Sequence, residues 1–119
     1  MPMPRYAILE HDFPALHWDF MLEEGASLRT WRLLLPPIPG CDVIALSLPP
    51  HRLIYLDYEG PVSGNRGYVT RWDHGHFEWI SDTPRYVRCR LHGVRFIGEW
   101  EFLDDILGRG SFCAAIGTT

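Results

Sequence analysis

Leu16-His17-Trp18-Asp19-Phe20-Met21-Leu22-Glu23 is the stretch of sequence that decides the fold. Successive side chains of an extended chain point to opposite faces, so every second residue of this stretch shares a face. One face carries Leu16, Trp18, Phe20 and Leu22, whereas the other carries His17, Asp19, Met21 and Glu23. The pattern predicts a β-strand whose apolar face packs on the core. It leaves His17 and Asp19 on a face that core burial does not explain.

Short runs of β-favouring residues recur at even spacing on both sides of this strand. They lie at 6–9, 28–35, 43–48, 68–72, 76–80, 86–92 and 94–102. Segments rich in Gly, Pro and Asp separate the runs, and these residue types interrupt strands and form turns. Many short strands at even spacing predict a β-barrel or a β-sandwich.

Four segments are expected to interrupt or follow the strands. Pro49-Pro50 offers no backbone donors and should end the strand that begins at Val43. Asp73-His74-Gly75 should form a hairpin turn. The one plausible helix lies within 103–107, and residues 111–119 are rich in Gly, Ala and Thr and should form a loosely held tail.

The composition indicates one globular domain. A chain of 119 residues can bury one core but not two, so we treat residues 1–119 as a single domain. The 46% apolar content argues against disorder, and the 13% aromatic content suits a well-packed sheet. A net charge of −4 would not attract a polyanion by itself, so any contact with nucleic acid must be local.

The three cysteines indicate free thiols rather than disulfides. Cys41, Cys89 and Cys113 are odd in number and have no close pairing, which fits neither a disulfide framework nor a Cys-rich zinc site. The first residues contain no apolar signal segment, and no run is long enough to span a membrane. We therefore expect a cytoplasmic protein.

The polar face of the first strand carries a candidate metal site. His17 and Asp19 lie two residues apart, so an imidazole and a carboxylate can converge on one ion, and His11 can return to the same face through the intervening loop. Two imidazoles and one carboxylate would leave coordination positions open for water or a phosphoryl oxygen. By spacing alone the pattern is weak, because such residues are more often surface or hydrogen-bonded groups. His51 adds a third imidazole, but the spacing does not show whether it reaches the site.

Four stretches together resemble the 3′-phosphoesterase domain of bacterial DNA ligase D. The first runs from His11-Asp12 through Leu16-His17-Trp18-Asp19-Phe20-Met21-Leu22-Glu23 and resembles the family's metal-binding motif. The other three are His51-Arg52-Leu53-Ile54-Tyr55-Leu56-Asp57-Tyr58-Glu59-Gly60, Gly67 through Trp72-Asp73-His74-Gly75, and Arg90-Leu91-His92-Gly93 through Gly98-Glu99-Trp100. The resemblance spans about 6–102.

This resemblance implies a fold, an activity and a site. The fold would be mainly β, a compact single-domain barrel-like structure with at most one or two short helices. The activity would remove a 3′-terminal ribonucleoside and then the 3′-phosphate during DNA end repair, with Mn²⁺ or another divalent metal such as Zn²⁺ or Co²⁺. His11, His17 and Asp19 would bind the metal, His51 would contact the scissile phosphate, and Tyr55 would lie beside it.

The resemblance also implies partners. Nucleic-acid 3′ ends, in primer-template DNA or in an RNA–DNA hybrid, would be the substrate. The polymerase and ligase modules that usually accompany such a domain are absent from this sequence, so any association with them would be with separate proteins. No membrane partner is expected.

The sequence departs from the family motif at the phosphate contacts. Met21 and Val43 occupy positions where the family carries Arg, and Pro49-Pro50 replaces an acidic pair. Another arginine of the chain could make the missing phosphate contact, but this is the less expected case. The three candidates are Arg52, Arg66 and Arg71. Three functions therefore remain open: a metal-dependent phosphoesterase, a non-catalytic module that binds ends or anions, and a small metalloenzyme acting on a non-nucleotide substrate.

Overall fold

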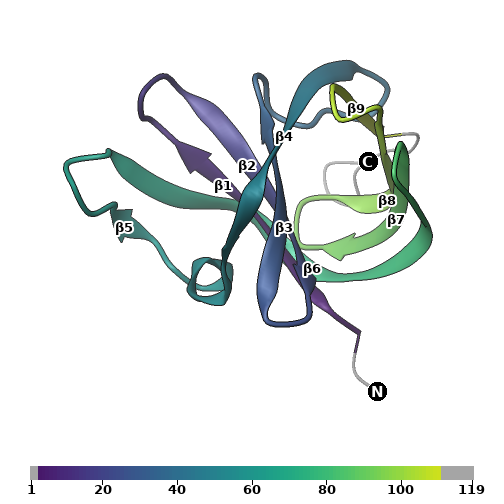
Figure 1. Cartoon of the computed structure of the whole chain (residues 1–119), viewed down its shortest axis with the longest axis horizontal. Helices are drawn as coiled ribbons and strands as arrows, with labels where there is room; N and C mark the ends of the chain where they lie inside the picture. The colour runs from purple at the N-terminus through teal and green to yellow at the C-terminus, as the bar shows by residue number, and fades with distance from the viewer. Residues whose placement is uncertain (1–2, 111–119) are drawn as a thin grey trace.

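The computed structural model describes residues 3–110, which form nine antiparallel strands and one 3₁₀ turn (Figure 1). The elements are β1 (Arg5–His11), β2 (His17–Glu24), β3 (Ser27–Leu33), β4 (Asp42–Arg52), η1 (Leu53–Leu56), β5 (Gly60–Pro61), β6 (Tyr68–Thr83), β7 (Tyr86–Gly93), β8 (Ile97–Leu103) and β9 (Leu107–Gly110). The mainly β fold class is confirmed. No helix in the described part of the chain is long and apolar enough to cross a membrane.

The strands close into a ring. Their order is β1-β2-β3-β4-β9-β8-β7-β6-β5, and β1 also pairs with β6. Figure 1 shows the long β6 ribbon running from the side of the molecule that carries β5 to the side that carries β7 and β8. Because β6 pairs with β1 along one part and with β7 along another, it joins the two halves of the sheet.

The larger core fills the interior of this ring. Its side chains come from β1, β2, β3, β4, β6, β7 and β8, as a closed sheet requires when alternate residues point inward. Its aromatic members are Tyr6, Trp18, Phe20, Trp31, Phe77, Phe96, Trp100 and Phe102. Trp31 and Phe102 stack with their ring centroids 3.8 Å apart. The apolar face of β2 is therefore the inward face, as the alternation predicts for Trp18, Phe20 and Leu22. For Leu16 the prediction is wrong, because this residue precedes β2 and is 53% exposed.

A second, smaller core covers the outer face of β1 and β2. It comprises Ala7, Leu9, Met21, Leu28, Leu56 and Val69, against which Tyr55, Tyr58 and Val62 pack. The segment that contains η1 and β5 supplies the covering residues. The outer face of β2 is thus buried too, and the interpretation that core burial plays no part on this face is wrong. A local alternation shows which residues share a face, but it cannot show that a distant segment covers that face.

The expected hairpin at Asp73-His74-Gly75 is also wrong, because β6 continues through it. Gly75 pairs with Tyr6 of β1 on one side and with Gly93 of β7 on the other. A Cβ at Gly75 would overlap the backbone of β7, so glycine serves here for close strand approach rather than for a turn.

Asp73 is buried at this junction and anchors three partners. Its Oδ2 accepts a hydrogen bond from the Tyr6 hydroxyl at 2.8 Å, and its two carboxylate oxygens accept backbone N–H bonds from Arg95 at 2.7 Å and Phe96 at 3.2 Å. Because these partners belong to β1 and to the β7–β8 connection, one carboxylate ties together the elements that close the ring.

Two further expectations are corrected at β4 and β9. Strand β4 runs through Pro49-Pro50 rather than ending there, because the two prolines face one residue of β3, Arg29, in a bulge that needs no regular ladder hydrogen bonds. The segment 103–107 is no helix, since its residues join β8 to β9 through a tight turn. The expected tail at 111–119 lies outside the described residues.

Candidate metal and anion site

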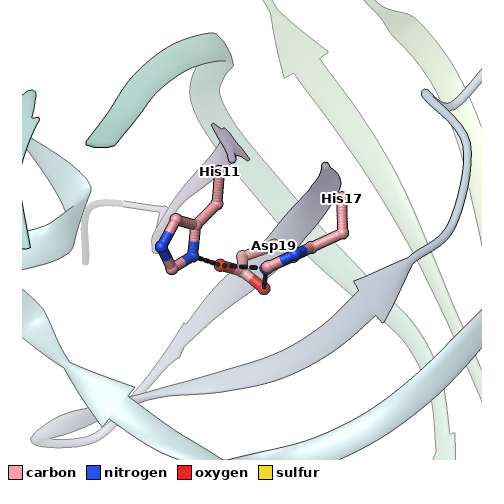
Figure 2. A group of neighbouring side chains, drawn as sticks. All are labelled: His11, His17 and Asp19. Carbon is pink, nitrogen blue, oxygen red and sulfur yellow. Dashed lines mark hydrogen bonds and ion pairs between the residues drawn. The ribbon is translucent and has the colours of Figure 1, made fainter. Parts of the chain in front are cut away.

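The three candidate metal ligands meet on the outer face of the ring. His11 ends β1 and His17 begins β2, and the two are direct partners in the antiparallel pairing. Asp19 follows two residues later on the same face. One ligand atom from each residue lies within 4.8 Å of the other two, and Figure 2 shows both imidazoles directed at the carboxylate. The structure thus brings together the three residues that the sequence suggested.

Backbone carbonyls fix the orientation of both imidazoles. His11 Nε2 lies 2.8 Å from the carbonyl oxygen of Arg66, and His17 Nδ1 lies 2.8 Å from that of Ala15. A carbonyl oxygen only accepts, so each of these nitrogens carries a proton and donates it. The remaining nitrogens, His11 Nδ1 and His17 Nε2, face Asp19 Oδ2 at 3.3 Å each.

This arrangement suits a cation. In neutral imidazoles the two nitrogens that face Asp19 carry lone pairs, which would repel the carboxylate unless a positive group lies among them. Ligating histidines typically donate their other N–H to a carbonyl in this way. The donor set of two nitrogens and one carboxylate fits a divalent transition metal. His11, His17 and Asp19 would hold it.

Asp19 is suited to remain ionised in spite of its burial. Burial by itself would raise the pKa of Asp19, but without a metal, a hydrogen bond from protonated His17 and the positive charges of protonated His17, His51 and His11 outweigh it, so the pKa lies below its ordinary value.

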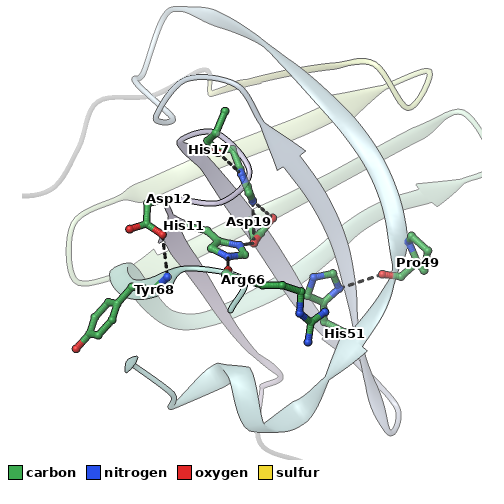
Figure 3. A network of polar contacts seen from close by, with 9 residues as sticks. His11, Asp12, His17, Asp19, Pro49, His51, Arg66 and Tyr68 are labelled. Atoms are coloured by element: carbon green, nitrogen blue, oxygen red, sulfur yellow. Dashed lines mark hydrogen bonds and ion pairs between the residues drawn. The ribbon is translucent and has the colours of Figure 1, made fainter. Parts of the chain in front are cut away.

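A cleft of about 600 Å³ opens beside the three residues. His11 and Asp19 line it, together with His51 and Tyr55. The His51 ring is held by its Nδ1, which donates to the Pro49 carbonyl at 3.0 Å (Figure 3). The centroid of this ring lies 6.2 Å from that of Tyr55. All five sequence-derived candidates therefore gather at one place: four line the cleft, and buried His17 lies just behind it.

Two of the arginines suggested as substitute phosphate contacts also line the cleft. These are Arg52 and Arg66, whereas Arg71 lies elsewhere and bonds the Leu56 carbonyl at 3.1 Å. A third cleft arginine, Arg32 on β3, escaped the sequence analysis. The signal that could have found it is pairing register, because Arg32 stands opposite Asp19, but register is not readable from local alternation.

Neither position where the family carries Arg faces the cleft. Met21 is 0% exposed and belongs to the outer core, while Val43 is 4% exposed and belongs to the ring interior. In this chain the cations of the cleft come from other positions. The cleft carries three arginines and one carboxylate, so it is locally positive within a chain of net charge −4.

The segment that covers the site is fastened to the β1–β2 loop. Asp12 Oδ1 accepts the Tyr68 backbone N–H at 2.8 Å (Figure 3). A Cβ at Gly67 would overlap the side chains of Asp12 and Phe13, so glycine permits this close approach. The same segment supplies the Arg66 carbonyl that orients His11. The position of this covering segment therefore affects the orientation of a candidate metal ligand.

Comparison with known proteins gives a consistent family match. Residues 9–104 match the family model described as the DNA ligase D 3′-phosphoesterase domain. The chain is 30% identical over 110 residues to the multifunctional non-homologous end joining protein LigD of Pseudomonas aeruginosa, and 30% identical over 107 residues to that of Mycobacterium bovis. These alignments cover 83% and 82% of this chain but only 13% and 14% of the two relatives.

Proposed function

The chain belongs to the DNA ligase D 3′-phosphoesterase domain family, and from this premise we propose that it is a divalent-metal-dependent phosphoesterase acting on the 3′ ends of nucleic acid. The reactions would be removal of a 3′-terminal ribonucleoside and of a 3′-phosphate in DNA end repair. The observation that carries the proposal is the convergence of His11, His17 and Asp19 at the wall of a positively charged cleft.

The ligand set suits hydrolysis because it leaves coordination positions open. When bound, a divalent ion would polarise a phosphoryl oxygen and lower the pKa of a coordinated water. We propose Mn²⁺ as the ion, with Zn²⁺ or Co²⁺ as alternatives. In the phosphomonoester step, a water oxygen attacks phosphorus, the bond to the 3′ oxygen breaks, and the products are inorganic phosphate and a 3′-hydroxyl.

His51 and Tyr55 are the proposed catalytic residues. Since His51 Nδ1 donates to the Pro49 carbonyl, its Nε2 is the nitrogen left to meet the phosphate. A protonated imidazole there would stabilise the negative charge that grows in the transition state. Tyr55 lies beside His51 in the same cleft and would assist the phosphomonoester step.

The proposed partners follow from the same site. The relatives are named for non-homologous end joining, which agrees with a substrate at a DNA end. We propose that this chain binds 3′ ends of primer-template DNA or RNA–DNA and works together with ligase and polymerase activities. The cytoplasmic location stays a prediction.

A second function is favoured by the buried Met21 and Val43. Since neither position presents a cation to the cleft, the chain could keep the metal and bind an end or a small anion without hydrolysing it. Under this alternative, calorimetry would detect metal binding while no phosphoester tested is hydrolysed.

The test is release of phosphate from a 3′-phosphorylated primer-template in the presence of MnCl₂, with a 3′-terminal ribonucleotide primer assayed in parallel. His17→Ala should lower the rate by at least about 100-fold, because it removes a ligand from the centre on which the chemistry depends. Manganese affinity, measured by calorimetry, should fall with it.

His92→Ala is the matched control, since this imidazole lies on the surface and binds only Glu78, at 2.6 Å, among the described side chains. It should leave both rate and metal affinity unchanged. Absence of turnover by the native chain, or equal turnover after His17→Ala, refutes the phosphoesterase.

A further inference from the structure

Arg32 occupies a distinctive place on β3. It stands directly opposite Asp19 in the β2–β3 pairing, and directly opposed residues of antiparallel strands point to the same face with side-chain bases about 5 Å apart. Its side chain therefore leaves the sheet on the outer face, beside the candidate ligands. It lines the cleft that His11, Asp19 and His51 also line.

Most arginines of the described residues have partners inside the protein. Seven form ion pairs with carboxylates: Arg5, Arg29, Arg71, Arg85, Arg88, Arg90 and Arg109. Arg95 lies over the Trp72 ring at 4.2 Å. The typical arginine of this chain is thus engaged by a group of its own protein.

The other two cleft arginines are also engaged. Arg66 donates from Nε to the Ser63 carbonyl at 2.7 Å and from Nη2 to the Ser63 hydroxyl at 3.0 Å. Arg52 lies over the Tyr55 ring, with its guanidinium carbon 5.9 Å from the centroid. Both side chains therefore already contact a group of their own protein.

Arg32 differs from all of these. Its Nε is buried and has no hydrogen-bond partner within residues 3–110. Arg32 as a whole is only half-buried, but a buried donor without an acceptor is costly, so a ligand oxygen at this Nε would stabilise the side chain. The guanidinium fork matches two oxygens of one phosphate.

We propose that Arg32 binds the oxygens of the terminal 3′-phosphate and positions that group against His11, His17 and Asp19. This inference rests on the proposed function and deepens it, because it assigns the phosphate contact to a strand that the family motif does not include. The cation reaches the cleft across the β2–β3 pairing instead of from Met21 on β2 itself.

The test measures binding rather than turnover. Fluorescein-labelled primer-templates that end in a 3′-phosphate or a 3′-hydroxyl are titrated with the protein in EDTA, and the two dissociation constants are compared by anisotropy. The native chain should prefer the phosphate by about 10- to 100-fold, the worth of one charge-assisted pair. Arg32→Gln should bring this ratio close to one, and Arg32→Lys should keep part of it.

Arg85→Gln is the control for loss of one positive charge, since Arg85 is 82% exposed and pairs with Asp104 on the surface. It should leave the preference unchanged. Thermal melting checks that each Arg32 variant is folded. If Arg32→Gln does not fold, the phosphate preference of Arg32→Lys is compared with that of the native chain instead.

The outcomes separate this inference from the proposed function. A native chain without preference for the phosphate, or an unchanged preference in both Arg32 variants, overturns the role of Arg32 even if hydrolysis with manganese is observed. An Arg32-dependent preference in a chain that shows no hydrolysis supports the role of Arg32 and refutes only the catalytic proposal.

Discussion

Replacing Tyr6 with Phe removes one hydroxyl group from the junction that closes the ring of strands and leaves the aromatic ring in place. The hydroxyl donates to Asp73 Oδ2 at 2.8 Å, and both side chains are almost fully buried, with 1% and 2% exposure. Burial and the neighbouring Asp73 charge raise the pKa of Tyr6 far above its ordinary value, so the hydroxyl stays protonated and keeps donating.

The expected loss of stability follows from the hydrogen bonds that Asp73 keeps and the one that it loses. In the variant, Asp73 keeps the two backbone N–H donors of Arg95 and Phe96 and loses its only side-chain donor within residues 3–110. A buried hydrogen bond to a charged group is worth about 1.5–3 kcal/mol. We therefore expect Tyr6→Phe to lower the free energy of unfolding by about 2 kcal/mol. For a domain of this size that corresponds to a fall in Tm of roughly 8 °C.

The assay is urea unfolding followed by tryptophan fluorescence, with Tyr86→Phe as the matched control. The Tyr86 hydroxyl also donates to a carboxylate, Glu101 Oε1 at 2.6 Å, but this pair is only partly buried. Its loss should lower the unfolding free energy by less than about 1 kcal/mol, because water replaces the missing donor. Equal losses in the two variants, or a loss below about 0.5 kcal/mol for Tyr6→Phe at unchanged m-value, would refute the argument that Asp73 anchors the ring.

Three further predictions concern burial and packing. Met21→Ala should destabilise the fold by about 2–4 kcal/mol in the same urea assay, because the side chain is 0% exposed in the outer core, and a loss below 1 kcal/mol would contradict that burial. Gly93→Ala should cost at least about 1–3 kcal/mol or abolish soluble expression, since a Cβ there would overlap the Tyr6 hydroxyl; an unchanged Tm would show that the junction is looser than described. Iodoacetamide should label exposed Cys41 in the native protein but not Cys89, because burial shields the Cys89 thiol and raises its pKa above the ordinary range. Peptide mass mapping before and after unfolding tests this prediction. Labelling of Cys89 in the native protein would contradict it.

Much of the candidate site follows from the sequence alone. Period-2 alternation in 16–23 assigns Trp18 and Phe20 to one face and His17 and Asp19 to the other, because side-chain direction along a strand is a local property. The same local rule locates most strands between their turn residues. The resemblance to the ligase D domain then selects His51 and Tyr55 from the remaining polar residues, and the structure places both in the same cleft.

Only the tertiary structure decided which segments come together. That β6 passes through Gly75 without turning depends on two neighbouring strands, β1 and β7, that are distant in sequence. That the outer face of β2 is buried depends on the covering segment around η1. Arg32 reaches the cleft because register sets it opposite Asp19. Pairing register and coverage are non-local, since they depend on how distant segments meet, whereas alternation along one strand carries information only about that strand.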